Sequence, residues 1–392
     1  MKKFRLPLLA WILIAIALGI LCGLFVPAFI VRAMNTFDAI FDQLLRFFIP
    51  LIIIGLVTPA IAEVGSRAGR MLVVTVAIAY GFTVLSGLFA YGFSTAIFPH
   101  VVDAGGLAEL DAADNVFAPY FTIAIPPLCE VMTALVLSFV VGIGIATTKA
   151  SALLKGFEEA KNIIVRSIEK VIIPVLPIYI FGLFLDMTAA GKVGPVLKSF
   201  LVMVVVIFAM TLVLLVLQFL LAGLVAGKNP FRMLAGMLPA YMTALGTASS
   251  AATIPVTLKC AERNGVSSPV AGFTVPLCAT IHLSGSTLKI TSCAIALMMM
   301  LGMEVEFSTL LGFVMMLGVT MVAAPGVPGG AIMAALGILG SMLGFDAPTQ
   351  AMMITLYIAM DSFGTACNVT GDGAIALIMD RIAARRSPAP TE

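Results

Sequence analysis

The sequence predicts an all-α polytopic membrane protein with eight transmembrane helices and two re-entrant helical hairpins arranged as inverted repeats. Hydrophobic residues make up 61% of the 392 residues and charged residues only 11%, whereas a soluble globular domain carries about 25% charged residues. The apolar runs are continuous rather than alternating, which argues against a transmembrane β-barrel. The positive charges fall mainly between alternate runs, and two stretches rich in small residues interrupt the pattern.

Continuous apolar runs long enough to cross a bilayer mark the expected helices. They cover residues 7–31, 38–62, 71–98, 120–148, 163–190, 196–226, 268–301 and 349–380. Two broken regions, 231–260 and 308–345, separate the last three runs. The first run follows basic residues, but it is too long for the core of a signal peptide and lacks a small-residue cleavage pattern. It is therefore expected to remain as the first helix.

The distribution of Lys and Arg predicts the orientation. If the N-terminus is cytoplasmic, Arg46 and Lys289 lie within runs and nearly all the other basic residues face the cytoplasm; the exceptions are Arg32, Lys192 and Lys198. This asymmetry predicts a multi-pass protein of the plasma or inner membrane with both termini in the cytoplasm. The asymmetry holds only if each broken region returns to the side that it entered, so both regions are predicted to be re-entrant hairpins.

Small residues and prolines form the expected tips of the hairpins, at 247–255 and 324–330. Such peptide breaks a helix and frees backbone groups, which a membrane tolerates only where they are buried or line a cavity. Each hairpin is followed by a run with a polar interruption, at 280–286 in the first case and at 359–372 in the second. Paired interruptions in two halves of a chain point to a transporter with a binding site near the bilayer midplane.

Polar residues form a stripe on the last run. Asp361, Asn368 and Asp372 fall within about 40° of one another on a helix that turns about 100° per residue, and Gly364 and Thr365 lie between them near the same stripe. A charged residue at the bilayer centre costs about 2.5–3.5 kcal/mol on insertion scales. The stripe is therefore expected to line a solute or ion path.

At these motifs the chain resembles the dicarboxylate/amino acid:cation symporter family, which includes the glutamate transporters. The matching segments, in order, are Ser249-Ser250, Thr253-Ile254-Pro255-Val256-Thr257, Pro276-Leu277, Ala279-Thr280, Gly326-Val327-Pro328-Gly329 and Asn368-Val369-Thr370-Gly371-Asp372. The resemblance implies a homotrimer in the lipid bilayer, in which a transport domain moves as an elevator past a static scaffold and the second hairpin is the external gate. The scaffold would hold residues 1–62 and 120–190, and the transport domain residues 71–98, 196–226, 231–260, 268–301, 308–345 and 349–386.

The resemblance also implies a substrate. Members that take acidic amino acids place an Arg three residues after the aspartate of the last helix or in the first hairpin; here these positions are Gly364 and Ala248. Because Asp361, which meets the substrate ammonium in amino-acid carriers, is kept, a small neutral amino acid is expected, with Gly364 leaving room for its side chain. The implied substrate-binding residues are Ser249, Ser250, Ser286, Val327, Pro328, Gly329, Asp361, Gly364, Thr365 and Asn368.

Two alternatives to this reading stay open. In the first, the substrate is a dicarboxylate bound by Lys289. The second belongs to another class, an anion channel-like activity. Asp361 also has a purely structural interpretation, as a carboxylate paired with Lys289.

Coupling is expected to use Na⁺, H⁺ or both. In the family the first interrupted helix reads Asn-Met-Asp-Gly-Thr and contributes to sodium sites, whereas this chain reads His282-Leu283-Ser284-Gly285-Ser286. His282, with Lys289 near the same helical face, is expected to replace part of the sodium coupling, as a fixed positive charge or by carrying a proton. Alternatively, His282 is a neutral hydrogen-bonding residue and Lys289 extends toward water. The sodium ligands implied here are Thr280, Asn368 and Asp372.

Other classes of function are not supported by the residues. His282 lies too close to Ser284 and Ser286 on one broken helix to form a nucleophile–base pair with either, so the chain is not expected to be an enzyme. The six cysteines are scattered through apolar segments without metal-ligand spacing, which is typical of core residues. No organic cofactor and no nucleic-acid partner are expected.

Overall fold

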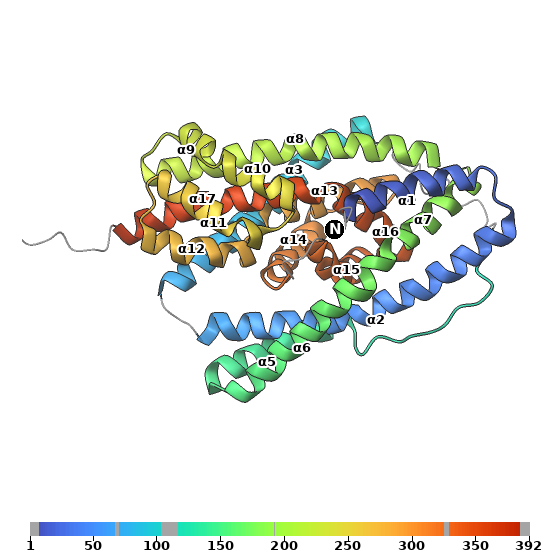
Figure 1. The fold of residues 1–392 in the computed structure, drawn as a ribbon, viewed down its shortest axis with the longest axis horizontal. Helices are drawn as coiled ribbons and strands as arrows, with labels where there is room; N and C mark the ends of the chain where they lie inside the picture. Colours follow the sequence, from blue (N-terminus) through green and yellow to red (C-terminus); the bar gives the residue numbers. More distant parts are fainter. Residues whose placement is uncertain (1–7, 67–69, 103–116, 192, 325–328, 385–392) are drawn as a thin grey trace, which may run out of the picture.

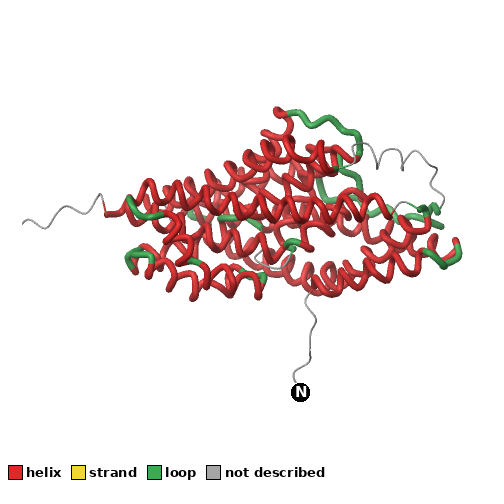
Figure 2. The backbone as a smooth tube through the Cα atoms, turned by 90° about the horizontal axis from the view of Figure 1, so that it is seen from above, coloured by secondary structure: helices red, strands yellow, loops and turns green. Residues whose placement is uncertain are grey.

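The computed structural model describes residues 8–66, 70–102, 117–191, 193–324 and 329–384. All regular secondary structure in these ranges is helical, and many of the helices run along the long axis of the molecule (Figures 1 and 2). Six helical segments of the described chain are long and apolar enough to cross a membrane. The predicted class, an all-helical protein embedded in a membrane, is confirmed.

The first half of the chain forms long helices. They are α1 (Leu8–Gly23), α2 (Ala28–Ser66), α3 (Arg70–Val101), α5 (Val131–Thr148), α6 (Ser151–Ser167), the π-helical turn η1 (Ile168–Ile172), α7 (Ile173–Ala189) and α8 (Val193–Ala226).

Several predicted ends of these helices are wrong. The helix predicted at 7–31 stops at Gly23, and α2 begins just after Pro27. The helix predicted from residue 120 begins only at Val131, because a proline disfavours helical geometry in the residue before it and Pro126-Pro127 falls inside the predicted run. The helix predicted at 163–190 begins earlier, since α6, η1 and α7 run on without a break from residue 151.

The two broken regions form antiparallel helix pairs. After the short helix α9 (Pro230–Gly236), the first pair is α10 (Leu238–Thr247) and α11 (Ser250–Arg263), and the second is α14 (Phe307–Val322) and α15 (Gly330–Leu343). The first pair turns at Ala248, which has left-handed backbone angles (φ 48°, ψ 31°). In the second pair, residues 325–328 of the predicted tip lie outside the described residues, and Gly329 has φ 74°.

Each predicted interruption, 280–286 and 359–372, contains a helix break, but the breaks are much shorter than predicted because most of these residues are helical. Residues 282 and 283 separate α12 (Ser268–Ile281) from α13 (Ser284–Met300), and Met360 separates α16 (Ala347–Ala359) from α17 (Asp361–Ala384). The two breaks leave backbone groups near the middle of the molecule that intrahelical bonds do not satisfy. Side chains from neighbouring helices bond several of these groups.

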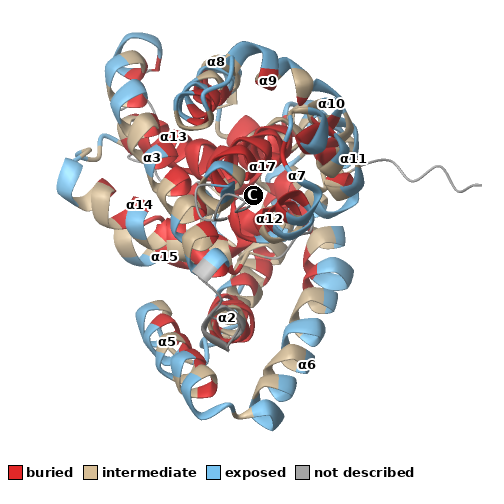
Figure 3. Ribbon diagram, turned by 90° about the vertical axis from the view of Figure 1, so that its left-hand side faces the viewer, coloured by how far each residue is buried: buried red, intermediate tan, exposed pale blue. Residues whose placement is uncertain are grey.

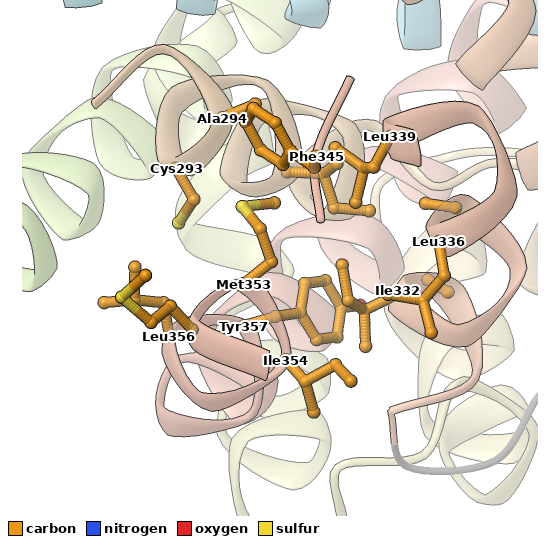
Figure 4. Packing of buried hydrophobic residues seen from close by; sticks show 14 of the residues in the cluster. Cys293, Ala294, Ile332, Leu336, Leu339, Phe345, Met353, Ile354, Leu356 and Tyr357 are labelled. Atoms are coloured by element: carbon orange, nitrogen blue, oxygen red, sulfur yellow. The ribbon is translucent and has the colours of Figure 1, made fainter. Parts of the chain in front are cut away.

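Helices α13 and α17 lie at the centre of the molecule, where nearly all residues of α13 and most of α17 are buried (Figure 3). Helices α2, α5 and α6 lie to one side of this centre (Figures 1 and 3). Between α15 and α16 the core is apolar, with Ile332, Met353 and Tyr357 side by side (Figure 4). This packing fixes the position of Tyr357, which reaches the site described below.

Two glycines spaced four residues apart let α1 pack closely against α7. A Cβ added at Gly19 would lie 2.8 Å from the carbonyl oxygen of Phe181, and one at Gly23 would lie 2.5 Å from the Cβ of Thr188. Small residues at this spacing allow two helix backbones to approach in a membrane, where packing rather than the hydrophobic effect drives association. The close contact of α1 and α7 therefore depends on these glycines.

We expect Gly19→Leu to destabilise the protein, because the new side chain would force α1 away from Phe181. Overpacking of this kind costs about 1–3 kcal/mol. The thermal unfolding midpoint of the purified protein in detergent would measure the loss. Gly92→Leu is the matched control, since a Cβ at Gly92 meets nothing within 4 Å. Equal midpoints for the two variants would contradict the prediction.

Candidate functional site

A cavity of about 520 Å³ lies where the two interrupted helices approach the helix pairs. This volume is typical of small-ligand sites. Leu56 and Ala60 of α2 contribute to one apolar side. Among the described residues of the lining, Asp361 is the only carboxylate, and the only cation is Lys161, which is exposed on α6. The polar lining otherwise consists of Ser250, Thr280, Ser286, Tyr357, Thr365 and Asn368.

Six of the fourteen predicted site residues line this cavity, six others lie outside its lining, and two fall outside the described residues. Ser249 caps α11, where its Oγ accepts a hydrogen bond from the Ala252 amide at 3.3 Å. Gly329 contributes a backbone N–H to Asp361. Val327 and Pro328 lie outside the described residues. The predicted residues found in the wall are Ser250, Thr280, Ser286, Asp361, Thr365 and Asn368, whereas Gly364, Asp372, His282 and Lys289 are not part of the described wall.

Asp361 connects three segments of the chain. It is the first residue of α17, where the helix dipole favours a negative charge. Its Oδ2 accepts a hydrogen bond of 3.0 Å from the amide of Gly329, at the start of α15. Its Oδ1 lies 3.6 Å from the ammonium of Lys289 on α13. The carboxylate is therefore partnered on two sides while 8% of the residue remains accessible from the cavity.

Lys289 is completely buried and occupies the space beside Gly364. Its Nζ donates to the carbonyl oxygen of Met360 at 3.2 Å and lies 3.8 Å from the centre of the Tyr357 ring, a cation–π contact. A Cβ at Gly364 would overlap the Cε and Nζ of Lys289. The expectation that Gly364 leaves room for a substrate side chain is therefore wrong, because Lys289 fills that room. The alternative in which Lys289 extends toward water is also wrong, because its side chain has no exposed surface.

His282 is paired with Asp372 in the interior. Its Nδ1 lies 2.9 Å from Oδ1 of Asp372, and both side chains are almost completely buried. When Asp372 is ionised, its carboxylate only accepts hydrogen bonds and Nδ1 is the donor. The expectation that His282 and Lys289 share one helical face is wrong, because the break after Ile281 gives His282 extended backbone angles (φ −104°, ψ 106°). The two basic residues consequently serve two different carboxylates.

Gln218 of α8 approaches the far side of the imidazole. It donates from Nε2 to Oγ of Ser284 at 2.9 Å. A Cβ at Gly371 would lie 2.6 Å from His282 Cε1 and 2.8 Å from Gln218 Oε1. Among the described residues, neither Oε1 of Gln218 nor Nε2 of His282 has a hydrogen-bond partner. Two buried polar atoms beside Gly371 thus keep unused hydrogen-bonding capacity.

Asn368 closes the first interruption. Its Oδ1 accepts hydrogen bonds from the amides of Gly285 at 2.8 Å and Ser286 at 3.4 Å, which satisfies free N–H groups at the start of α13. Its Nδ2 donates to Oγ of Ser286 at 3.1 Å, and that hydroxyl lies 3.0 Å from the hydroxyl of Tyr357. This network ties the two interrupted helices together at the cavity wall.

The three residues implied to bind sodium all have partners within the protein. The Thr280 hydroxyl donates to the Leu277 carbonyl at 2.7 Å, Asn368 accepts two backbone N–H groups, and Asp372 is paired with His282. The described residues contain no group of three or more His, Cys, Asp or Glu side chains that could hold a metal ion. Sodium binding at Thr280, Asn368 and Asp372 stays a prediction.

Sequence reasoning missed Tyr357 and Gln218. Tyr357 precedes Asp361 by four residues, a spacing that places two residues on one face of a continuous helix. Because the helix breaks at Met360, this spacing does not by itself place the two side chains together. Gln218 is a polar residue within a long, strongly apolar helix. Polar residues inside membrane helices usually face the interior of the bundle, so its position alone was an available signal.

The fold and the cavity define a class, the helical membrane carriers of small solutes, because two interrupted helices converge on one buried carboxylate. The chain belongs to the sodium:dicarboxylate symporter family, which it matches over residues 8–382. This membership confirms the resemblance found in the motifs. The family and the relatives below are transporters, which supports the expectation that the chain is not an enzyme.

The chain is similar to two curated transporters along almost its whole length. It is 28% identical over 381 residues to the serine/threonine transporter SstT of Acinetobacter baumannii (strain AYE), an alignment that covers 94% of this chain and 95% of the relative. It is 26% identical over 392 residues to the serine/threonine transporter SstT of Streptococcus thermophilus (strain CNRZ 1066), covering 95% and 96% of the two chains.

We expect His282→Ala to destabilise the protein strongly, because it leaves the carboxylate of Asp372 buried without a donor. Removing one partner of a buried pair costs roughly 3–5 kcal/mol. The unfolding midpoint in detergent would measure this loss, with His100→Ala as control because His100 is exposed at the end of α3. The double variant His282→Ala with Asp372→Ala should lose less than the single variant. A single variant as stable as the His100 control would contradict the prediction.

Proposed function

We propose that the chain is a secondary active symporter that takes up a small neutral amino acid, with serine and threonine as the first candidates, together with a cation. The observation that carries the proposal is the charge of the described lining: its one carboxylate, Asp361, is accessible, whereas the neighbouring ammonium of Lys289 is enclosed. The substrate ammonium would bind Asp361. The relatives named as serine/threonine transporters support the same substrate class.

The substrate carboxylate would bind at the start of α11. Ser250 is the first residue of this helix and lines the cavity, and the free N–H groups and the dipole at a helix N-terminus attract anions. The Asn368 amide, in contrast, is already engaged with Ser286. Hydroxyl groups of Ser286, Tyr357 and Thr365 in the wall would suit a substrate that carries a hydroxyl of its own.

Among the described residues, the dicarboxylate alternative lacks a buried cation that is free to take the second carboxylate. Lys289 would have to leave the Met360 carbonyl, the Tyr357 ring and the space beside Gly364 to reach the cavity. Lys161, the cation of the lining, is exposed on α6. A substrate with an ammonium and a single carboxylate therefore fits this cavity better than a dicarboxylate does. The observations also give no support to an anion channel.

The transport would follow the elevator mechanism of the resemblance. We assign α1, α2, α5, α6 and α7 to a static scaffold, supported by the extensive packing of α2 on α5 and of α1 on α7. The mobile domain would hold α3 and α8–α17, supported by the packing of α13 on α3 and of α17 on α8. The two helix pairs would be re-entrant hairpins among eight transmembrane helices. Exposed apolar residues of α5 such as Val136 and Val140 are suited to lipid or to the neighbouring subunits of a homotrimer.

We expect serine or threonine to stabilise the purified protein against heat, and succinate or malate to leave it unchanged. A ligand at one hundred times its Kd adds about 2.7 kcal/mol of stability by mass action. Asp361→Asn should abolish the shift, because it removes the partner of the substrate ammonium. A shift produced by succinate or malate, with none from the amino acids, would contradict the substrate assignment.

We expect labelled serine to accumulate in proteoliposomes only when a cation gradient is present. The assay would apply an inward sodium gradient without a pH difference, and then an inward proton gradient without sodium. Coupling to Na⁺, which is typical of the family by its name, predicts accumulation in the first condition, and a proton carried by the chain predicts it in the second. Equilibration without accumulation under both gradients would contradict symport.

A further inference from the structure

Lys289 is a buried charge that substrate binding, as proposed above, does not use. We propose that Lys289 is a tethered counter-cation: it balances Asp361 while no substrate is bound, and thereby allows the empty binding site to cross the membrane. The inference rests on the proposed transport function, because it concerns the return step of the same cycle.

The contacts of Lys289 are those of a permanent partner. Its side chain has no exposed surface, its Nζ lies 3.6 Å from Oδ1 of Asp361, and the Met360 carbonyl and the Tyr357 ring take up its remaining directions. A lysine ammonium has three donors and no acceptor, and three partners surround this one. The ammonium is therefore fully partnered without any substrate or ion.

Gly364 makes this position possible. The aliphatic end of Lys289 lies against the Gly364 backbone, where any side chain would overlap it. The ring of Tyr357 packs against the ammonium, and its hydroxyl lies 3.0 Å from that of Ser286. The ammonium is consequently confined beside Asp361 by its surroundings and does not depend on the occupancy of the cavity.

The physical need for such a partner arises in the empty site. An unpaired carboxylate is costly in the membrane interior, and removing one partner of a buried ion pair leaves that cost uncompensated. With substrate bound, the substrate ammonium also lies at Asp361. Without substrate, Lys289 is the only charged partner of Asp361 among the described residues. Loss of the lysine should therefore slow the movement of the empty site far more than that of the loaded site.

Two transport assays separate these movements. Exchange is measured as entry of labelled serine into vesicles preloaded with unlabelled serine, where only the loaded site needs to cross. Net uptake is measured in vesicles without internal amino acid under a cation gradient, where the empty site must return in every cycle. We expect Lys289→Met to reduce net uptake at least tenfold and to change exchange by no more than about twofold.

Two further variants sharpen the test. Gly364→Ala retains the lysine but moves its ammonium away from Asp361. It should therefore also reduce net uptake more than exchange. This second variant keeps the test valid if Lys289→Met folds poorly. Lys198→Met makes the same chemical change at an exposed residue of α8 and should leave both rates unchanged.

Equal losses of exchange and net uptake in folded Lys289→Met and Gly364→Ala would overturn the inference, as would normal net uptake in both. Failure of the unaltered protein to exchange serine, threonine or any other amino acid would instead overturn the proposed function, and the inference with it.

Discussion

The buried carboxylate of Asp361 is the constraint on which the site depends. A negative charge in the membrane interior persists only with partners, and this one has the Gly329 amide, the Lys289 ammonium and the start of α17 around it. These partners come from three separate segments. The requirement to pair one charge therefore fixes how α13, α15 and α17 meet, and with them the shape of the cavity.

The breaks in the helices provide further polar contacts at the site. An intact membrane helix uses its own N–H and C=O groups and offers none to a solute. At the break before α17, the carbonyl of Met360 accepts the ammonium of Lys289 in addition to the backbone amide of Gly364. The break at His282 frees amides at the start of α13, which donate to Asn368. The side chains of Asn368 and Lys289 therefore bond backbone groups at both breaks and create polar contacts in the interior.

Much of this arrangement could be predicted from the sequence, because it depends on the types of residue in short local segments. Small residues and prolines predicted the turn at Ala248, polar residues predicted the two interruptions, and a helical stripe identified Asp361 and Asn368. Contacts between segments that lie far apart in the sequence could not be predicted. Gly364 looked like open space because nothing local showed that Lys289, on another helix, fills it. Helix ends beside Pro27 and Pro126 were also misplaced, since hydrophobic runs continue past residues that backbone geometry excludes.

The two buried carboxylates of α17 bear on the replacement of the sodium motif by His282 and its neighbours. Asp361 has Lys289 and Asp372 has His282, both from the region around the first interruption. A mobile cation that binds here must either displace a basic partner or bind beside it, and displacing Lys289 would break its contacts with Met360 and Tyr357. His282 differs, because its Nε2 and Oε1 of Gln218 still have free hydrogen-bonding capacity among the described residues. If one of the two carboxylates exchanges its partner during transport, the contacts favour Asp372, while Asp361 keeps Lys289 and, under the proposed function, would bind the substrate.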